Sequence, residues 1–472
     1  MSSNLLYETI ADEIRQMITA GIYMTGEKLP SIHDLAQKKR ISHTTALKAY
    51  HLLESDGLIN PVPQSGYYVS YKSEIRNKSK VSPAKLPINM YDLDRITADD
   101  DPDSTLKYFG VGMMDERLVD TKLLNKNLIR VVRSIKSNSE LKLPMKGNME
   151  LRIELVKMMY QRNAELDPEQ MIITTNCFSS VYLALASLCR PNDLIAVESP
   201  CNYGALRIIE KLGLRVIEIP SDLTSGMDIS ELEKALNRYN IKAVYVNPNC
   251  NNPLGTIMPE SNKQKLAEII GKREIPLIED DVTGCLYFTE EQPCPIVSYD
   301  KKGYVLYCSS FSKSLIESYN VGWLTGGKFI EQILAYQRAS CSQVSALLQL
   351  AIARYLESGR YNVQLRKLRK IFRARTAMMI DDIHKYFPPY THVRQPQGGY
   401  LLWCKLPGSM DSLKLYRELS KQNLSCIPGK YFSTDDRYIN YMRLSAAFYD
   451  LSSREYLKKM GAVLYSLLLD EN

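Results

Sequence analysis

Seven short apolar runs, separated by stretches with helical periodicity, follow Pro87 and constrain the fold more than any other feature of the sequence. The runs are MIITT (171–175), LIAVES (194–199), RVIEI (215–219), AVYVN (243–247), PLIED (276–280), VLYCSS (305–310) and VGWLTGG (321–327). Strands that alternate with helices in this way favour a largely parallel sheet covered on both faces. Ligands of such sheets bind at the carboxyl ends of the strands. The sequence therefore predicts an α/β domain with a ligand site at that edge.

Three unusual residues stand at these strand ends: Asn252 in NNPLG, Asp280 in PLIED and Lys313 in SSFSKSLIESYN. Lys313 lies in a serine-rich turn after an apolar strand, where partial desolvation lowers the pKa of an amine that must attack an aldehyde. Enzymes that use pyridoxal 5'-phosphate (PLP) present their Schiff-base lysine in this way. A carboxylate at Asp280 would keep a pyridine nitrogen protonated and make the ring an electron sink; the neighbouring Asp281 is less suited. Taken singly, each residue is also compatible with a structural role in a turn, a cap or the surface.

The first seventy residues show a different pattern, three short helices followed by a hairpin. Apolar positions from 6 to 18 fall on one helical face, and Ser31 and Ser42 are expected to cap the second and third helices. Residues 58–69 alternate around the turn at 64–66, which indicates a hairpin. Three helices with a two-stranded wing form an α+β winged helix-turn-helix, whose third helix enters the major groove of DNA. The alternative is a helical packing module with a solvated polar face.

This region resembles the DNA-binding domain of the GntR family in GEKLPSIHDLA, ISHTTALKAYHLLESDGLI and PQSGYYV. The resemblance implies that the domain binds double-stranded DNA. His33 and His43 stand where family members commonly place arginines, and neutral histidine lacks the permanent charge and the fork of arginine. The DNA-contacting residues that the resemblance implies are Ser31, His33, Ser42, His43, Thr44, Thr45, Lys48 and Gly66.

Residues 105–470 resemble fold-type-I aminotransferases, through MKGNMELRIELVKMM, NNPLG, IEDD, SSFSK, GGYLLW and NYMRLS. Together with the first domain, the whole chain resembles a MocR-type regulator of the GntR superfamily. We expect a winged helix-turn-helix over 1–70, a polar linker over 71–87, and an aminotransferase-like domain over 88–472. Its large subdomain covers about 105–350. A long charged helical stretch from about 354 to 386 leads into a small C-terminal α+β subdomain, about 360–472.

The resemblance assigns a role to several residues of the large domain. Lys313 would form the Schiff base, Asp280 would hold the pyridine nitrogen and Asn252 the phenolic oxygen. Ser310, Thr175 and Cys177 lie where the family holds the cofactor phosphate, and Arg443 where it grips the α-carboxylate of a substrate. No residue is expected to bind a metal.

Four departures surround the same cofactor. Asn320 replaces the arginine that pairs with the phosphate, and Asn176 with Cys177 replaces a Gly-Ser pair, although glycine there lets backbone N–H groups approach the phosphate. Asn202 stands where an aromatic ring stacks on the pyridine, and Val282 replaces a tyrosine. A lost charged hydrogen bond costs about 1.5–3 kcal/mol and a lost stack about 0.5–1.5 kcal/mol. These two losses weaken binding on the order of 30- to 1000-fold, so the sequence predicts a partly degenerate site and leaves PLP binding open.

Composition bounds the partners. The net charge of +7 permits nucleic acid without requiring it, and no apolar run reaches the ~18 residues of a membrane span. Ten cysteines without a CxxC pair favour reduced thiols in the cytoplasm. The leading hypothesis is a homodimeric transcription regulator that senses PLP or an amino-acid-like small molecule. The alternatives are a PLP-dependent aminotransferase with an accessory DNA-binding domain, and a ligand-independent regulator whose large domain only dimerises.

Overall fold

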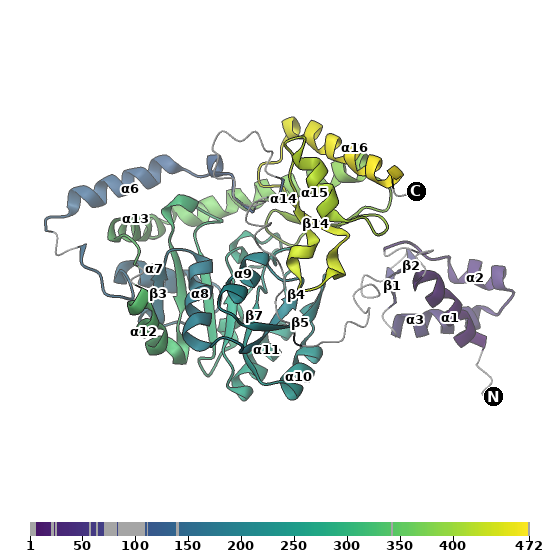
Figure 1. Cartoon of the computed structure of the whole chain (residues 1–472), viewed down its shortest axis with the longest axis horizontal. Helices are drawn as coiled ribbons and strands as arrows, with labels where there is room; N and C mark the ends of the chain where they lie inside the picture. Colours follow the sequence, from purple (N-terminus) through teal and green to yellow (C-terminus); the bar gives the residue numbers. More distant parts are fainter. Residues whose placement is uncertain are drawn as a thin grey trace. The chain divides into compact units, whose positions relative to one another are not determined.

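The computed structural model describes residues 6–19, 23, 26–55, 58–62, 65–69, 83, 109–110, 112–137, 141–340 and 343–470. These residues form two compact units, with the division at Lys80 and Val81 (Figure 1). The expected linker, 71–87, lies outside the described residues apart from Pro83. No helix in the described ranges is long and apolar enough to cross a membrane.

The first unit is built from three helices and a hairpin. They are α1 (Leu6–Thr19), α2 (Ile32–Lys39), α3 (His43–Ser55), β1 (Ile59–Val62) and β2 (Gly66–Val69), with β1 and β2 antiparallel. The expected caps are present, since Ser31 Oγ accepts from the Asp34 amide and Ser42 Oγ from the Thr45 amide, both at 3.1 Å. Tyr50 and Leu53 of α3 are fully buried and pack with Ile10 and Ile14 of α1.

An eight-stranded sheet organises the second unit. Its order is β3 (Met171–Thr174), β10 (Gly322–Thr325), β9 (Val305–Ser310), β8 (Leu277–Asp280), β7 (Ile241–Val246), β4 (Leu194–Ser199), β5 (Arg215–Asp222) and β6 (Gly226–Met227). β4, β5, β7, β8 and β9 are parallel, whereas β10 is antiparallel to both of its neighbours. Each of the seven predicted runs overlaps one of these strands, and the sheet is largely parallel as expected.

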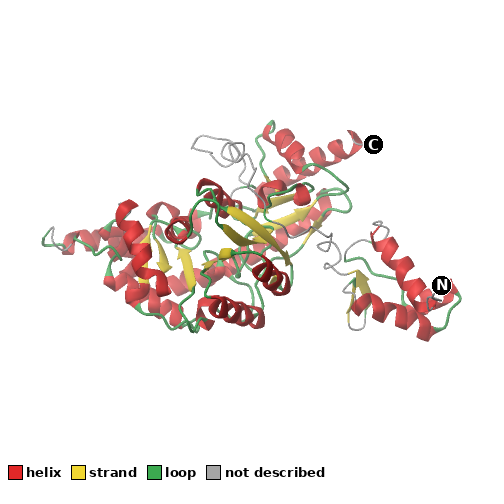
Figure 2. Cartoon of the chain, turned by 60° about the horizontal axis from the view of Figure 1, so that its bottom comes forward, coloured by secondary structure: helices red, strands yellow, loops and turns green. Residues whose placement is uncertain are grey.

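Helices cover both faces of this sheet, which explains why its strands are mostly apolar. In β4, Ala196 belongs to one core cluster and its neighbours Ile195 and Val197 to another, because successive side chains point to opposite faces. The first cluster contains residues of α7 (Met149–Tyr160), α10 (Ile229–Arg238), α11 (Glu260–Arg273) and α13 (Ala346–Glu357). The second contains residues of α8 (Cys177–Leu188), α9 (Tyr203–Lys211) and α12 (Ile330–Ser340). Figure 2 shows the strands between these helices. A further helix, α6 (Thr121–Ser134), packs on α13.

A smaller antiparallel sheet forms the C-terminal subdomain. Its order is β11 (His392–Val393), β12 (Leu401–Lys405), β14 (Tyr441–Ser445) and β13 (Ile427–Pro428), and it packs with α14 (Arg360–Tyr386), α15 (Ser412–Ser420) and α16 (Arg454–Asp470). The helical stretch expected from about 354 is interrupted. Gly359 adopts φ +69° and separates α13 from α14, since a left-handed residue ends a helix.

Candidate functional site

A cavity of about 550 Å³ lies at the carboxyl ends of the parallel strands, as the topology predicts. The N-termini of α8 and α9, the loop after β9, and β14 of the small subdomain all contribute to its wall. Of the residues singled out in the sequence, the cavity brings together Lys313, Asn252, Cys177, Arg443, Asn176, Asn202, Val282 and Asn320.

Lys313 carries the amine of this cavity. Its side chain is 21% exposed, and its Nζ lies 3.4 Å from Oε1 of Glu317, four residues further along the chain. A second charged partner is absent from the described residues around it. The amine is therefore partly withdrawn from water and held by one weak contact.

Asp280 lies beneath the cavity rather than in its wall. Its carboxylate is buried and accepts hydrogen bonds from the Tyr245 hydroxyl at 2.8 Å, the Cys177 thiol at 3.2 Å and the Val282 amide at 3.3 Å. Burial raises the pKa of Asp280, and among the described residues no cation is paired with it. Cys177 lines the cavity and contacts Asp280, so it separates this carboxylate from the space in which a ligand would lie.

Two of the asparagines that depart from the family pattern are helix caps. Asn176 Oδ1 accepts from the Ser179 amide at 2.8 Å and begins α8, and Asn202 Oδ1 accepts from the Gly204 amide at 3.0 Å and begins α9. Both helices direct their N-termini into the cavity. The first amides of a helix and its dipole favour an anion, and these caps leave the first amides of α8 uncovered.

Arg443 lies on β14 and is fully buried at the opposite wall. Its Nη1 donates to Asn252 Oδ1 at 3.1 Å and its Nη2 to the Gly110 carbonyl at 2.6 Å, whereas its Nε has no partner in the described part of the chain. The guanidinium lies 5.1 Å from the ring centre of Tyr203 and 5.6 Å from that of Phe432. This cation–π arrangement holds the fork in a fixed orientation.

The remaining predicted residues differ in their relation to the cavity. Asn320 is exposed, adopts φ +48° and lines the cavity. Ser310 and Thr175 are outside the cavity wall: Ser310 Oγ shares a hydrogen bond with Ser312 at 2.8 Å, and Thr175 Oγ1 shares one with Ser179 at 2.6 Å. Val282 contributes an apolar side chain to the wall.

The cavity wall also contains four residues that were not predicted from the sequence: Phe178, Arg207, Glu317 and Tyr400. Arg207 lies four residues after Tyr203 on α9, so the two share a helical face. That spacing could have identified Arg207 once Tyr203 was placed at the site. Tyr400 donates its hydroxyl hydrogen to the Gly112 carbonyl at 2.8 Å and connects the small sheet to the cavity wall.

The candidate DNA-binding residues fall into two groups in the first unit. Ser31, Ser42 and Thr45 are used within the unit, because both serines cap helices and Thr45 Oγ1 shares a 2.7 Å hydrogen bond with Ser42. His33, His43, Thr44 and Lys48 are exposed; Lys48 Nζ lies 5.9 Å from the Tyr7 ring. Gly66 adopts φ +118° where the wing turns, next to Lys28.

The fold and the cavity define a fold-type-I aminotransferase domain joined to a winged helix-turn-helix. Residues 118–457 match the family of class I and II aminotransferases, and residues 6–69 match the gntR family of bacterial regulatory proteins. Solved structures with the same fold include the α-aminoadipate aminotransferase LysN of Thermus thermophilus (TM-score 0.72, 23% identity, 77% of this chain and 93% of that one). A kynurenine aminotransferase of Pyrococcus horikoshii gives a TM-score of 0.70 at 23% identity and covers 77% of this chain and 92% of its own.

Curated relatives match nearly the whole length of the chain. The HTH-type transcriptional regulator YdcR of Escherichia coli is 32% identical over 98% of this chain and 99% of its own length, and YjiR of the same organism is 34% identical over 97% and 98%. NorG of Staphylococcus aureus is 27% identical over 89% and 95%. The chain therefore belongs to the MocR-type transcriptional regulators, which combine a GntR domain with a class I and II aminotransferase domain.

Proposed function

We propose that the protein is a dimeric, DNA-binding transcription regulator whose aminotransferase-like domain binds PLP or an amino-acid-like effector in the 550 Å³ cavity. The observation that carries this proposal is that Lys313, Asn252 and Arg443 line one cavity. The chain that contains this cavity matches named transcriptional regulators over nearly its whole length. The amine of Lys313 is partly desolvated, and the buried guanidinium of Arg443 has an Nε without a partner in the described residues. Packing of the fold alone does not require these two groups to line the same cavity.

The described residues fit PLP at three positions. Lys313 offers the amine for the aldehyde, and the N-terminus of α8 offers amides for the phosphate. Buried Asp280 has no cation partner in the described structure, so a protonated ring nitrogen would supply the missing charge. PLP would bring the electron-withdrawing ring that its chemistry needs. Arg443 and Tyr203 would then hold the carboxylate of an amino-acid-like effector at the opposite wall.

The fit is weaker at the phosphate and below the ring. Asn320 places no charge beside the phosphate, and the Cys177 thiol lies between Asp280 and the cavity. These differences reduce the cofactor's affinity and its activation. They favour binding over sustained transamination, the second candidate function.

A titration of the full-length protein with PLP tests the proposal. We expect a new absorption band and an adduct at Lys313 after borohydride reduction. Lys313→Ala should lose both while its far-UV circular dichroism is unchanged.

DNA binding, followed by fluorescence anisotropy on promoter fragments of the surrounding genes, should change on addition of PLP and amino acids. If the wild-type protein forms no adduct and DNA binding is insensitive to both ligands, the effector-sensing proposal is wrong. Rapid conversion of an amino acid to its keto acid would instead favour the second candidate function, a PLP-dependent aminotransferase.

A further inference from the structure

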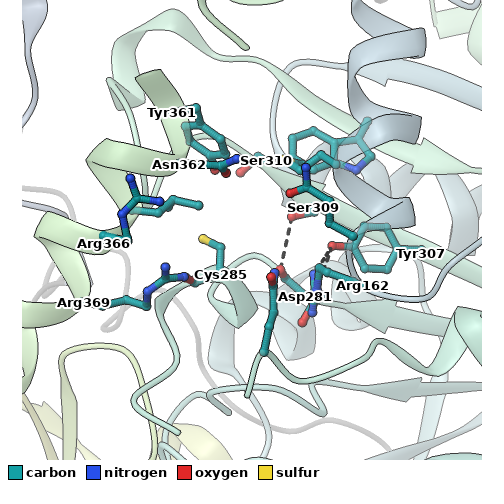
Figure 3. A pocket seen from close by; sticks show the side chains of 15 residues that line it. Arg162, Asp281, Cys285, Tyr307, Ser309, Ser310, Tyr361, Asn362, Arg366 and Arg369 are labelled. Carbon is teal, nitrogen blue, oxygen red and sulfur yellow. Dashed lines mark hydrogen bonds and ion pairs between the residues drawn. The ribbon is translucent and has the colours of Figure 1, made fainter. Parts of the chain in front are cut away.

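A second, smaller cavity of about 220 Å³ lies on the other side of β8 from Asp280. Successive residues of a strand point to opposite faces, so Asp280 contacts the first cavity's wall through Cys177, whereas Asp281 lines the second cavity. Its walls are the C-terminal end of α7 and the residues after it, the ends of β8, β9 and β10, and the first turns of α14 (Figure 3).

On the strand side of this cavity, the charged groups are already paired with each other. The carboxylate of Asp281 accepts from Arg162 at 2.5 Å, from the Tyr307 hydroxyl at 2.8 Å and from Asn249 Nδ2 at 2.9 Å. Arg162 also donates to the Pro293 carbonyl at 3.0 Å. Arg162 neutralises this buried carboxylate, and the three hydrogen bonds hold it on the strand side of the wall.

The helix side carries unneutralised positive charge. Arg366 is exposed and forms no ion pair or hydrogen bond within the described structure. Arg369 donates to the Cys285 carbonyl at 3.2 Å and lies over the Tyr287 ring at 4.2 Å, without a carboxylate partner in the described residues. Figure 3 shows both guanidinium groups on one side of the cavity, across from Arg162 and Asp281. Paired guanidinium forks are suited to oxyanions.

One of the lining residues also carries a buried donor without a partner. Trp323 is 2% exposed, and its Nε1–H has no hydrogen-bond partner in the described part of the chain. A buried donor without an acceptor costs about 1–3 kcal/mol. The hydrogen bonds to Asp281 come from Arg162, Tyr307 and Asn249, so this carboxylate is not the acceptor for the indole N–H.

We propose that this cavity is a second ligand site, which binds a small oxyanion, a carboxylate or a phosphate, through Arg366, Arg369 and the indole N–H of Trp323. In the described residues the two guanidinium groups have no carboxylate partner and the indole N–H has no acceptor, so the complementary ligand is an acceptor-rich anion. The volume is below the roughly 300–1,000 Å³ of sites for drug-sized ligands, which restricts the ligand to a small acid or a phosphate ester.

The occupant would contact the loop that carries Lys313. Ser310 lines the second cavity, and its hydroxyl shares a 2.8 Å hydrogen bond with Ser312 of the first. Tyr361, also in the second wall, shares one of the same length with Ser314. Ser312 and Ser314 flank Lys313, so a ligand in the second cavity acts on both neighbours of the amine.

The chain contains two tryptophans, Trp323 and Trp403, which makes the site observable by fluorescence. In a Trp403→Phe protein, titration with inorganic phosphate and with succinate at constant ionic strength should give a saturable change in the emission of Trp323. Adding Arg366→Gln should weaken the affinity at least tenfold; its exposed side chain makes misfolding a minor concern. Lys370→Gln removes one charge from an exposed position of α14 outside the cavity and should leave the affinity unchanged.

Calorimetry on the unsubstituted full-length chain provides the second measurement. The tighter of the two probes identifies the ligand as a carboxylic acid or as a phosphate. Lys313→Ala should keep the response, which separates this site from the proposed PLP site. The inference fails if neither method detects saturable binding, or if Arg366→Gln and Lys370→Gln bind the anion equally well.

Discussion

Two constraints act on position 320, its place in the cavity wall and its left-handed backbone, and the sequence shows only the first. Asn320 lines the cavity where the family pattern has arginine, and its φ of +48° is left-handed. Asparagine tolerates this conformation better than most residues, whereas other L-residues lose about 1–2 kcal/mol there. Asparagine is therefore suited to the local backbone, although it provides no positive charge for the phosphate of the proposed PLP site.

We predict that Asn320→Arg tightens PLP binding and lowers stability. A charged hydrogen bond to the phosphate contributes about 1.5–3 kcal/mol, and the left-handed backbone costs about 1–2 kcal/mol. Asn320→Gln has the same backbone cost without the charge, so it is the matched control. PLP affinity from absorbance titrations should be at least tenfold higher for arginine than for glutamine, with similar urea midpoints for the two apo-proteins. Equal affinities would mean that another group, such as Arg207, neutralises the phosphate.

The individual asparagines show what the sequence could and could not predict about the site. Lys313, Asn252 and Arg443 were expected at one site and do line one cavity. Asn176 and Asn202 were interpreted only as missing cofactor contacts. Their capping hydrogen bonds depend on the exact starts of α8 and α9, and sequence periodicity places a helix start only to within a few residues. Ser310 and Thr175 were expected at the phosphate but do not line the cavity, and their hydroxyls share hydrogen bonds with Ser312 and Ser179.

Among the elements, the buried strands were the most predictable. Strands covered on both faces are continuous apolar runs, and all seven runs overlap strands. The two-residue strands β6, β11 and β13 were not predicted, because two residues carry no periodicity. The break between α13 and α14 depends on one left-handed glycine within a continuous helical pattern, so the sequence did not reveal it.

The carboxyl ends of β4 and β8 bury several acids, which gives the second unit a predictable pH dependence. Burial raises the pKa of Glu198 well above its ordinary value and that of Glu279 to about 8. The folded protein then keeps protons that the unfolded chain releases above a pH of about 4.3. Since the unfolded state binds fewer protons, stability falls as the pH rises from about 4.5 to about 8.

Glu198→Gln tests this effect at one residue. Glu198 Oε1 accepts from the Asn247 amide at 2.8 Å, and a glutamine oxygen can accept the same bond. We expect the variant to unfold at a higher temperature than the wild type at pH 8, with a smaller difference at pH 5. Glu233→Gln, at a half-exposed position of α10, is the control and should follow the wild type. A wild-type melting temperature that rises steadily from pH 5 to pH 8 would contradict the assigned direction.

At the scale of the whole molecule, the second unit presents apolar surface that a dimer would cover. Ile129 and Val132 on α6 are 51% and 52% exposed, and Met149 on α7 and Phe178 on α8 are each 42% exposed. Phe178 also lines the 550 Å³ cavity, so one exposed apolar residue lies at the edge of the candidate ligand site. Ile129 and Val132 are three residues apart and share one face of α6, and an exposed apolar face of this kind is typical of an interaction surface.

We predict that the chain dimerises through this surface. A fragment of residues 88–472 should sediment as a dimer, and Ile129→Asp with Val132→Asp should convert it to a monomer, because charges there would be buried without partners. Leu451→Asp, at an apolar position of the small subdomain that is 69% exposed, should leave the dimer intact. A monomeric 88–472 fragment, or a dimer unaffected by the α6 changes, would place the interface elsewhere.

The last prediction concerns DNA, because the two domains act together only if the first one binds it. Phosphate contacts dominate the affinity of such domains and make it depend on salt, whereas contacts to base edges determine the sequence preference. Lys48 and Thr44 are both exposed on α3, the helix that enters the major groove in this class of fold. A lysine is suited to phosphate, and a threonine can reach a base edge.

We therefore expect the two residues to give different results in the same assay. In anisotropy titrations of the full-length protein on a bound genomic fragment, Lys48→Ala should weaken binding to all sequences and reduce the slope of log affinity against log salt by about one per monomer. Thr44→Ala should leave that slope unchanged and alter the preference among operator variants, by about 1–3 kcal/mol at the contacted base pair. Lys122→Ala, on exposed α6 of the second unit, is the control for a general loss of charge and should match the wild type. If Lys48→Ala and Lys122→Ala have the same effect, α3 does not contact the phosphates, and the DNA-binding surface must be sought on another face of the first unit.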